Sequence, residues 1–441
     1  MKKAMRLAAA LFLLLFLLSG CSYTSTGIDS MLKPPTLSDQ QSQIYTALQA
    51  SVGKNIRLKY PRKGDFISAF LINDMDEEPS QEALVFYELA SSTPGTSVRI
   101  NILDQKDGRW ISTYDAVVPA SEVEKVSLIA VDRRKYLVIG FNQLGSPNKI
   151  ILIYSYEDGR LEKKFQTTCS NYEVMDLDGD KQTELVTISA EEGEEQMRTV
   201  TAELRRITSF GCSGLLSSTA LDPEVTRYSN ILRGKLLDGR SALYLDGIRG
   251  GSTLTTEILV INGPDRLENL MYEPEQGEDN LVRRTMRDTG SPAVDLDNDG
   301  VVEIPVRDPG KNSTEPFTEW YLYLGGALSR TKTTYAAYSL GYLFILPERW
   351  RGRVTAEFST NDSELIFYEY TPDQPSQEKK LLSIRVYRRG IYEREAEKKG
   401  YRLLWDNGQI LYAYQIYETS SELGISEQQV AENFQRYTNS R

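Results

Sequence analysis

The most informative stretch of this sequence is Asp295-Leu296-Asp297-Asn298-Asp299-Gly300, with Glu303 close behind it. Its acids stand at offsets 0, 2, 4 and 8. Two earlier stretches place acids at the same offsets: Asp74, Asp76, Glu78 and Glu82, and then Asp176, Asp178, Asp180 and Glu184. An apolar, strand-like run flanks each cluster on both sides. The pattern therefore predicts three copies of an acidic loop that joins two β-strands.

These loops belong to a longer repeat. Residues 126–141 and 231–245 repeat the two strand-like runs around a single acid. Turn signals such as Asp107-Gly108 and Asp158-Gly159 mark a second hairpin farther along each unit. Five such units between residues 56 and 335 predict a mainly β fold, a β-propeller of about five four-stranded blades that is closed or nearly closed. A pair of β-sandwiches and a β-solenoid are the alternatives.

Oxygen ligands at alternate positions of a tight loop suit calcium, which takes six to eight of them. The pattern resembles the FG-GAP and VCBS repeats of integrin α chains and many bacterial surface proteins, whose D-x-D-x-D-G-x-x-D loops lie between propeller strands. The resemblance implies calcium at all three clusters. The third loop follows the family pattern best and the first departs furthest, because Pro79 replaces a usual Gly and Glu78 a usual Asp. The alternative is that the loops are solvated acidic turns.

The N-terminus carries export signals. Lys2, Lys3 and Arg6 precede an apolar run over residues 7–18, which is too short to span a bilayer. Leu18-Ser19-Gly20-Cys21 resembles the lipobox of bacterial lipoproteins, which implies a signal peptide over residues 1–20 and lipid on Cys21. Residues 21–55 are expected to hold the lipidated Cys, a polar tether and a short helix over residues 38–50. This organisation predicts a lipid-anchored protein on the extracytoplasmic face of a cell membrane.

Composition excludes several functions. The formal net charge is −11, so nucleic acid is not an expected partner. The sequence has no histidine, which excludes His-dependent nucleophile activation and His-ligated metals. No Gly-rich phosphate loop follows a strand. Beyond Cys21, only Cys169 and Cys212 remain, and either a disulfide or two free thiols fit them.

The pattern changes after residue 335. Residues 336–441 are expected to form a small α+β sandwich domain, with strand-like runs, a hairpin signal at Asp406-Asn407-Gly408 and a final helix over residues 426–437 capped by Ser426. Residues 341–350 weakly resemble the opening strand of PsbP-like domains. These domains are α/β sandwiches that mostly bind partners.

Three functions fit these features. The leading prediction is a non-catalytic surface lipoprotein whose calcium-stabilised propeller binds an unknown protein or a cell-wall or polysaccharide ligand. No catalytic residue is assigned, and the chain is predicted not to be an enzyme. The first alternative is an extracellular polysaccharide-acting enzyme with a carboxylate pair as acid and base. The second is an accessory or sensory subunit of a membrane complex.

Overall fold

The computed structural model describes residues 37–436, apart from residues 77, 79, 133, 194–196, 309–316, 371–378 and 418–421. Cys21, the expected signal peptide and most of the expected tether lie outside the described residues. Within the described part of the chain, no helix is long and apolar enough to cross a membrane. The expected early helix is present as α3 (Asp39–Val52), with Ser38 as its N-cap.

The described residues form six antiparallel sheets, and the first five follow one another in chain order. The first sheet holds β1 (Ile56–Leu58), β2 (Phe70–Asn73), β3 (Glu82–Leu89), β4 (Val98–Lys106) and β5 (Arg109–Val118). The second holds β6 (Glu122–Val131), β7 (Arg134–Asn142), β8 (Lys149–Glu157) and β9 (Arg160–Cys169). The third holds β10 (Asn171–Met175), β11 (Thr183–Glu192), β12 (Arg198–Thr208), β13 (Gly211–Cys212) and β14 (Ser217–Leu221).

The fourth sheet holds β15 (Val225–Lys235), β16 (Ser241–Arg249), β17 (Thr253–Asn262), β18 (Arg266–Asn269) and β19 (Arg287–Asp288). The fifth holds β20 (Ile304–Asp308), β21 (Phe317–Leu324), β22 (Ala327–Ala337), β23 (Tyr342–Ile345) and β29 (Phe434–Arg436). The sixth holds β24 (Val354–Ser359), β25 (Glu364–Glu369), β26 (Lys379–Arg388), β27 (Arg402–Asp406) and β28 (Ile410–Ile416). Two short helices, α4 (Arg389–Glu395) and α5 (Glu427–Asn433), belong to the last part of the chain.

The first five sheets stack as propeller blades do, so the predicted mainly β, propeller-like fold of five units is confirmed. One apolar core fills each interval between consecutive sheets. Short turns connect the strands within a sheet. In the turns at Asp107-Gly108 and Asp158-Gly159 both residues have positive φ, as a two-residue hairpin turn requires.

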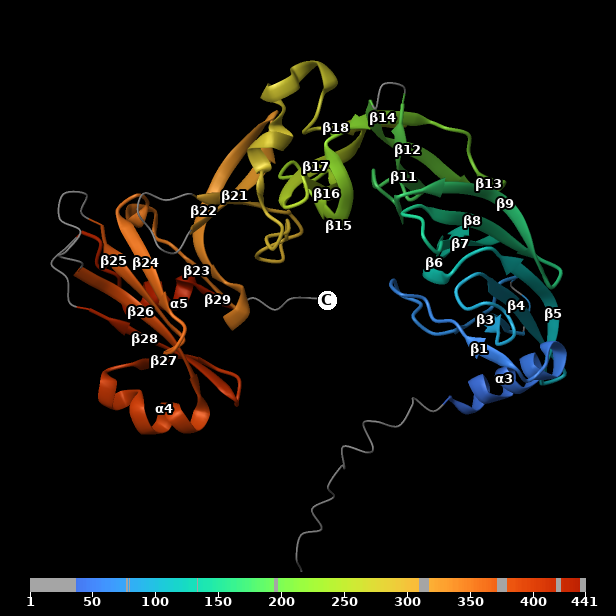
Figure 1. Ribbon diagram of the computed structural model, residues 1–441, viewed down its shortest axis with the longest axis horizontal. Coiled ribbons are helices and arrows are strands. Elements are labelled where there is room, and N and C mark those ends of the chain that lie inside the picture. Colours follow the sequence, from blue (N-terminus) through green and yellow to red (C-terminus); the bar gives the residue numbers. More distant parts are fainter. Residues whose placement is uncertain are drawn as a thin grey trace, which may run out of the picture.

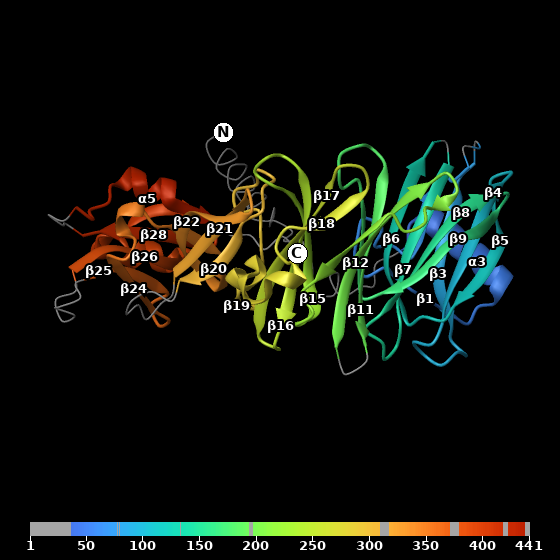
Figure 2. The same ribbon diagram turned by 90° about the horizontal axis from the view of Figure 1, so that it is seen from above.

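The ring does not close, so the prediction of a closed or nearly closed propeller is wrong in this respect. The sheets follow an open arc in which β1, β6 and β15 lie on the concave side and β5 and β9 on the convex side (Figure 1). Both ends of the stack are covered instead. Helix α3 buries Ile44 and Leu48 against the free face of the first sheet, beside Tyr87 and Trp110. The sixth sheet covers the fifth, as the view from above also shows (Figure 2). Covered end faces remove the need for the first and fifth sheets to meet.

The fifth and sixth sheets share one aromatic core. Tyr335 contacts Phe367 edge-on, with ring centroids 6.4 Å apart, and Trp350 lies 5.3 Å from the same ring. The expected boundary between residues 335 and 336 therefore falls inside β22, a strand of the fifth sheet. The expected final helix ends early, at Asn433. The next three residues form β29 on the edge of β23, which stacks Phe434 on Tyr342.

Candidate metal loops and the inner-edge pocket

The three acidic loops occupy equivalent places in their sheets. The first joins β2 to β3, the second joins β10 to β11, and the third precedes β20. In each loop three carboxylates bring one oxygen each within 4.8 Å of one another: Asp74, Asp76 and Glu82; Asp176, Asp178 and Glu184; Asp295, Asp297 and Asp299. Each group could hold a metal ion. The remaining predicted ligands, Glu78, Asp180 and Glu303, are not members of these groups.

The last acid of each motif closes its loop by the same hydrogen bond. Glu82, Glu184 and Glu303 are all buried, and each accepts from the backbone N–H of the motif's second residue. The donors are Met75 at 2.6 Å, Leu177 at 2.8 Å and Leu296 at 2.9 Å. This bond explains why a Glu recurs at offset 8, whose longer side chain reaches back to the loop.

A cation from a nearby strand of the same sheet reaches the second loop, and another reaches the third. Arg206 lies across the strand pair from Glu184 and donates from Nε to its carboxylate at 3.2 Å. Lys332 Nζ lies 3.0 Å from Asp297 and 3.1 Å from Glu303. These cations neutralise part of the charge that a metal would neutralise, and they compete with it for the same oxygens.

The first loop differs at this position. Asp104 takes the cross-strand place opposite Glu82 that Arg206 takes opposite Glu184. Among the described residues, no ion pair is formed by Glu82. Burial, together with Asp76, Asp104 and Asp74, raises the pKa of Glu82 to about 7. The first loop thus has a carboxylate at the cross-strand place where the second has Arg206, while Lys135 of β7 donates to Asn73 and to the backbone oxygen of Asp74.

The two remaining cysteines are free thiols. Cys169 is buried and Cys212 is partly buried, and both belong to the core between the second and third sheets. Burial raises the pKa of Cys169 to about 12 and that of Cys212 to about 11. Of the two alternatives, a disulfide or two free thiols, the structure has the free thiols.

A polar pocket of about 340 Å³ lies where the inner strands converge. It is called the inner pocket here, and it joins residues from the second, third and fourth sheets with the segment between β1 and β2. Its lining is Lys63, Gly64, Lys125, Asn171, Glu173, Tyr228, Ser229, Asn230 and Ile231. Strands β6 and β15 each carry a bulge here, with register shifts around Glu124 and around Ser229. Bulges redirect side chains and are frequent beside functional sites.

Charges in the inner pocket are paired between sheets. Glu173 accepts from Lys125 at 3.1 Å and from Arg233 at 2.6 Å. Burial alone would raise the pKa of Glu173, but these two cations hold it below its usual range. Nearby, Lys63 pairs with Glu124 at 3.1 Å. One oxygen of Glu124, Oε2, is buried and accepts no hydrogen bond.

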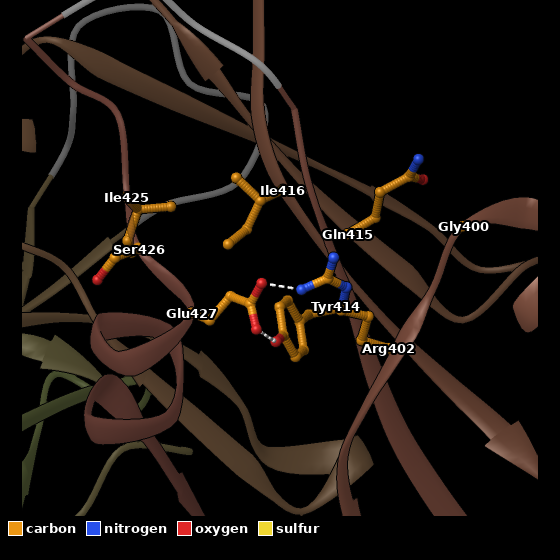
Figure 3. A pocket seen from close by; sticks show the side chains of 8 residues that line it. All are labelled: Gly400, Arg402, Tyr414, Gln415, Ile416, Ile425, Ser426 and Glu427. Atoms are coloured by element: carbon orange, nitrogen blue, oxygen red, sulfur yellow. Dashed lines mark hydrogen bonds and ion pairs between the residues drawn. The ribbon is translucent and has the colours of Figure 1, made fainter.

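A second pocket, of about 450 Å³, lies in the sixth sheet beside the start of α5 (Figure 3). Its polar side chains largely satisfy one another. Glu427 forms an ion pair with Arg402 and accepts a long hydrogen bond, 3.5 Å, from the Tyr414 hydroxyl. Ile416 and Ile425 supply its apolar wall. The inner pocket offers the amides of Asn171 and Asn230 and the hydroxyl of Ser229, the last two of which also bond Asp246.

No protein-family model and no curated protein matches this chain. Among solved structures, an exotype rhamnogalacturonan lyase, YesX, is 11% identical with a TM-score of 0.30, covering 74% of this chain and 73% of its own. The α-L-arabinanase of Penicillium chrysogenum is 11% identical with a TM-score of 0.27, over 82% and 98%. The exo-β-1,3-galactanase 1,3Gal43A of Clostridium thermocellum is 10% identical with a TM-score of 0.28, over 84% and 98%.

Each of these names is that of an enzyme acting on a polysaccharide. The sequence-based prediction that this chain is not an enzyme is therefore corrected and withdrawn. A likeness of this degree assigns no activity to this chain.

The sequence-based reasoning missed the residues of the inner pocket and the cations of the acidic loops. Glu124, Lys125 and Glu173 stand in the first strand of their units, where a run of charges reads as a solvated strand face. The recurring signal was a Lys or Arg about 20 to 30 residues after a motif's last acid, as for Arg206 and Lys332.

Proposed function

We propose that this chain is an extracytoplasmic protein that binds a polysaccharide in the inner pocket. The observation that carries the proposal is the convergence of three sheets and the segment between β1 and β2 on one open, polar pocket of ligand size. Asn171 offers an amide donor and acceptor there, and Ser229 and Asn230, whose Oγ and Nδ2 donate to Asp246, offer oxygen acceptors. Hydroxyl groups of a sugar ring require both kinds of partner. Charged groups beside them are held in place by ion pairs between sheets.

The location follows from the N-terminal sequence. Lipid on Cys21 would hold the chain on the outer face of a membrane, where polysaccharides are available. A fatty-acid probe should label the wild-type protein and not Cys21→Ser. Labelling of the variant would show that the lipobox resemblance is misleading.

We further propose that calcium stabilises the acidic loops, as their resemblance to FG-GAP and VCBS repeats implies. Three carboxylate groups of suitable composition support this proposal. The first loop has Asp104 at the cross-strand place where the second has Arg206, so we expect it to gain most from an added cation. The second and third loops already hold Arg206 and Lys332.

Cleavage of the bound polysaccharide is the second candidate function. Glu124 and Glu173 are the carboxylates that pair with the pocket's lysines. Glu173 is held ionised, as a catalytic base must be. Oε2 of Glu124 is the one buried oxygen of this pair that accepts no hydrogen bond.

The test combines binding and turnover. Purified full-length protein in detergent is titrated with a panel of cell-wall polysaccharides, and reducing ends are measured after incubation. The double variant Asn171→Ala with Ser229→Ala should weaken binding roughly thirtyfold, since two lost hydrogen bonds of about 1 kcal/mol each amount to about 2 kcal/mol. The exposed control Asn148→Ala should bind as wild type does. Unchanged binding in the double variant, or no binding by the wild-type protein, would contradict the proposal. New reducing ends that disappear in Glu173→Gln would establish cleavage.

A further inference from the structure

Three glutamates along the concave edge are each held by two cations. Glu88 pairs with Arg57 and Lys59, both at 2.8 Å. Glu124 pairs with Lys63 at 3.1 Å and Lys149 at 3.7 Å. Glu173 pairs with Lys125 at 3.1 Å and Arg233 at 2.6 Å. The same arrangement therefore recurs in three successive sheets, with the glutamates on β3, β6 and β10. Strands β1, which carries Arg57, and β6 lie on the concave side of the arc (Figure 1).

In each set the carboxylate is buried, and one of its two cations is exposed to solvent. The side chains of Glu88, Glu124 and Glu173 are only 7%, 9% and 11% exposed. One cation of each set is about half exposed: Arg57 at 47%, Lys63 at 52% and Arg233 at 46%. Solvent on this edge thus meets cations, in a chain whose overall charge is −11.

One cation would be enough to neutralise each glutamate. Lys125 on β6 joins the second sheet to the third through Glu173, and Arg233 on β15 joins the fourth sheet to the third through the same carboxylate. The second cation of each set leaves one positive charge in excess. In these three sets, six cations face three carboxylates, a surplus of three positive charges. A charged row of this sign favours an anionic ligand.

We propose that the concave edge binds a polyuronate, a polysaccharide with a carboxylate on each ring. This inference rests on the proposed polysaccharide function and adds the ligand's charge. The Arg233 guanidinium and the Lys63 ammonium would pair with successive carboxylates. The amide of Asn171 and the hydroxyl of Ser229, in the same pocket, would bond ring hydroxyls. A polyuronate offers both kinds of group on every residue, in contrast to a phosphate polymer with a short polyol backbone.

The test uses full-length protein in detergent and four polymers: polygalacturonate, its fully methyl-esterified form, a neutral galactan and a glycerol-phosphate polymer. No calcium is added, because calcium would neutralise and cross-link uronate carboxylates. Polygalacturonate should bind best, and its affinity should fall as salt is raised. Lys63→Gln and Arg233→Gln should each weaken it on the order of threefold, as expected for one partly exposed ion pair. The controls Lys399→Gln and Arg240→Gln alter cations of matching exposure elsewhere and should change nothing.

The outcomes separate the two claims. Equal binding of polygalacturonate and its methyl ester would overturn the anionic preference and leave polysaccharide binding standing. Stronger binding of the glycerol-phosphate polymer would overturn the choice of carboxylate. Binding of none of the four polymers would overturn both claims. Arg233 also donates to the backbone oxygen of Val174, so Arg233→Gln could lower the melting temperature. In that case the result for Lys63→Gln decides the test, because the Lys63 side chain has no such structural bond among the described residues.

Discussion

Arg206 on β12 lies directly opposite Glu184 on β11, with its Nε 3.2 Å from the carboxylate. In the first sheet the same cross-strand place opposite Glu82 holds Asp104. The same acidic motif therefore faces a cation in the third sheet and a carboxylate in the first. The consequence is a different dependence on metal in loops that look alike along the sequence.

Calcium should stabilise the first loop most. Extracellular calcium sites commonly bind at about 10⁻⁴ to 10⁻³ M, so millimolar calcium adds on the order of 1 kcal/mol per site. Asp76→Asn should remove a larger share of the calcium-dependent rise in melting temperature than Asp297→Asn. This order is the reverse of the one that the match to the family pattern favours. Equal losses in the two variants would show that the internal cations do not matter.

Removing an internal cation should make its loop respond more strongly to calcium. Arg206→Gln leaves Glu184 and its neighbours without a counterion, so the metal-free protein should be less stable. Calcium should then restore more stability than in wild type. The comparison is made by thermal unfolding with chelator and with calcium, and Lys399→Gln serves as an exposed control. An unchanged calcium response in Arg206→Gln would mean that the second loop binds no calcium.

Much of this architecture was predictable, because it depends on local patterns. Alternating apolar runs and Asp-Gly turns mark the strands, and Ser38 and Ser426 mark helix starts that the structure has. The open arc was not predictable, because it depends on which end faces are covered. Nothing in the sequence near Ile44 says that it packs on Tyr87 rather than on another blade. The inner pocket was missed for the same reason, since Lys125, Glu173 and Arg233 meet only through the stacking of sheets.

Helix α3 should be essential as an end cover. Leu48 is fully buried against the first sheet. Leu48→Ala should cost about 2–5 kcal/mol of unfolding free energy, as large-to-small changes in cores do. Urea denaturation provides the measurement, and Thr46→Ala, on the partly exposed side of the helix, is the control. A cost below about 1 kcal/mol would indicate that the helix is not an integral part of the fold.

The fourth sheet contains a buried ion pair that supports the third loop. Arg287 donates to Asp246 at 2.7 Å, both side chains are about 1% exposed, and Asp246 also accepts from the backbone of Ala293. Arg287→Met should destabilise the protein by about 3–5 kcal/mol, because it leaves a buried charge alone. The exposed pair of Arg240 and Asp238 offers a contrast, and Arg240→Gln should cost less than about 1 kcal/mol.

Stability should also depend on pH through Glu257. Burial raises the pKa of this carboxyl to about 7, although Tyr228, Asn269 and the Asp222 backbone donate to it. A carboxyl with a raised folded-state pKa stabilises the fold below its unfolded pKa of about 4.5, and this contribution is lost as pH rises through about 7. Urea unfolding at pH 5 and pH 7.5 should therefore show a smaller decrease with pH for Glu257→Gln than for wild type. Equal decreases would mean that Glu257 ionises normally.

Hydrogen exchange with and without a bound oligosaccharide tests the central proposal most directly, because it reports where on the chain the ligand lies. With an acidic oligosaccharide present, added protection should appear in β6, β10 and β15, around Lys125, Glu173 and Asn230. Protection confined to β28 and α5, around Tyr414 and Glu427, would instead place the ligand in the second pocket and contradict the account.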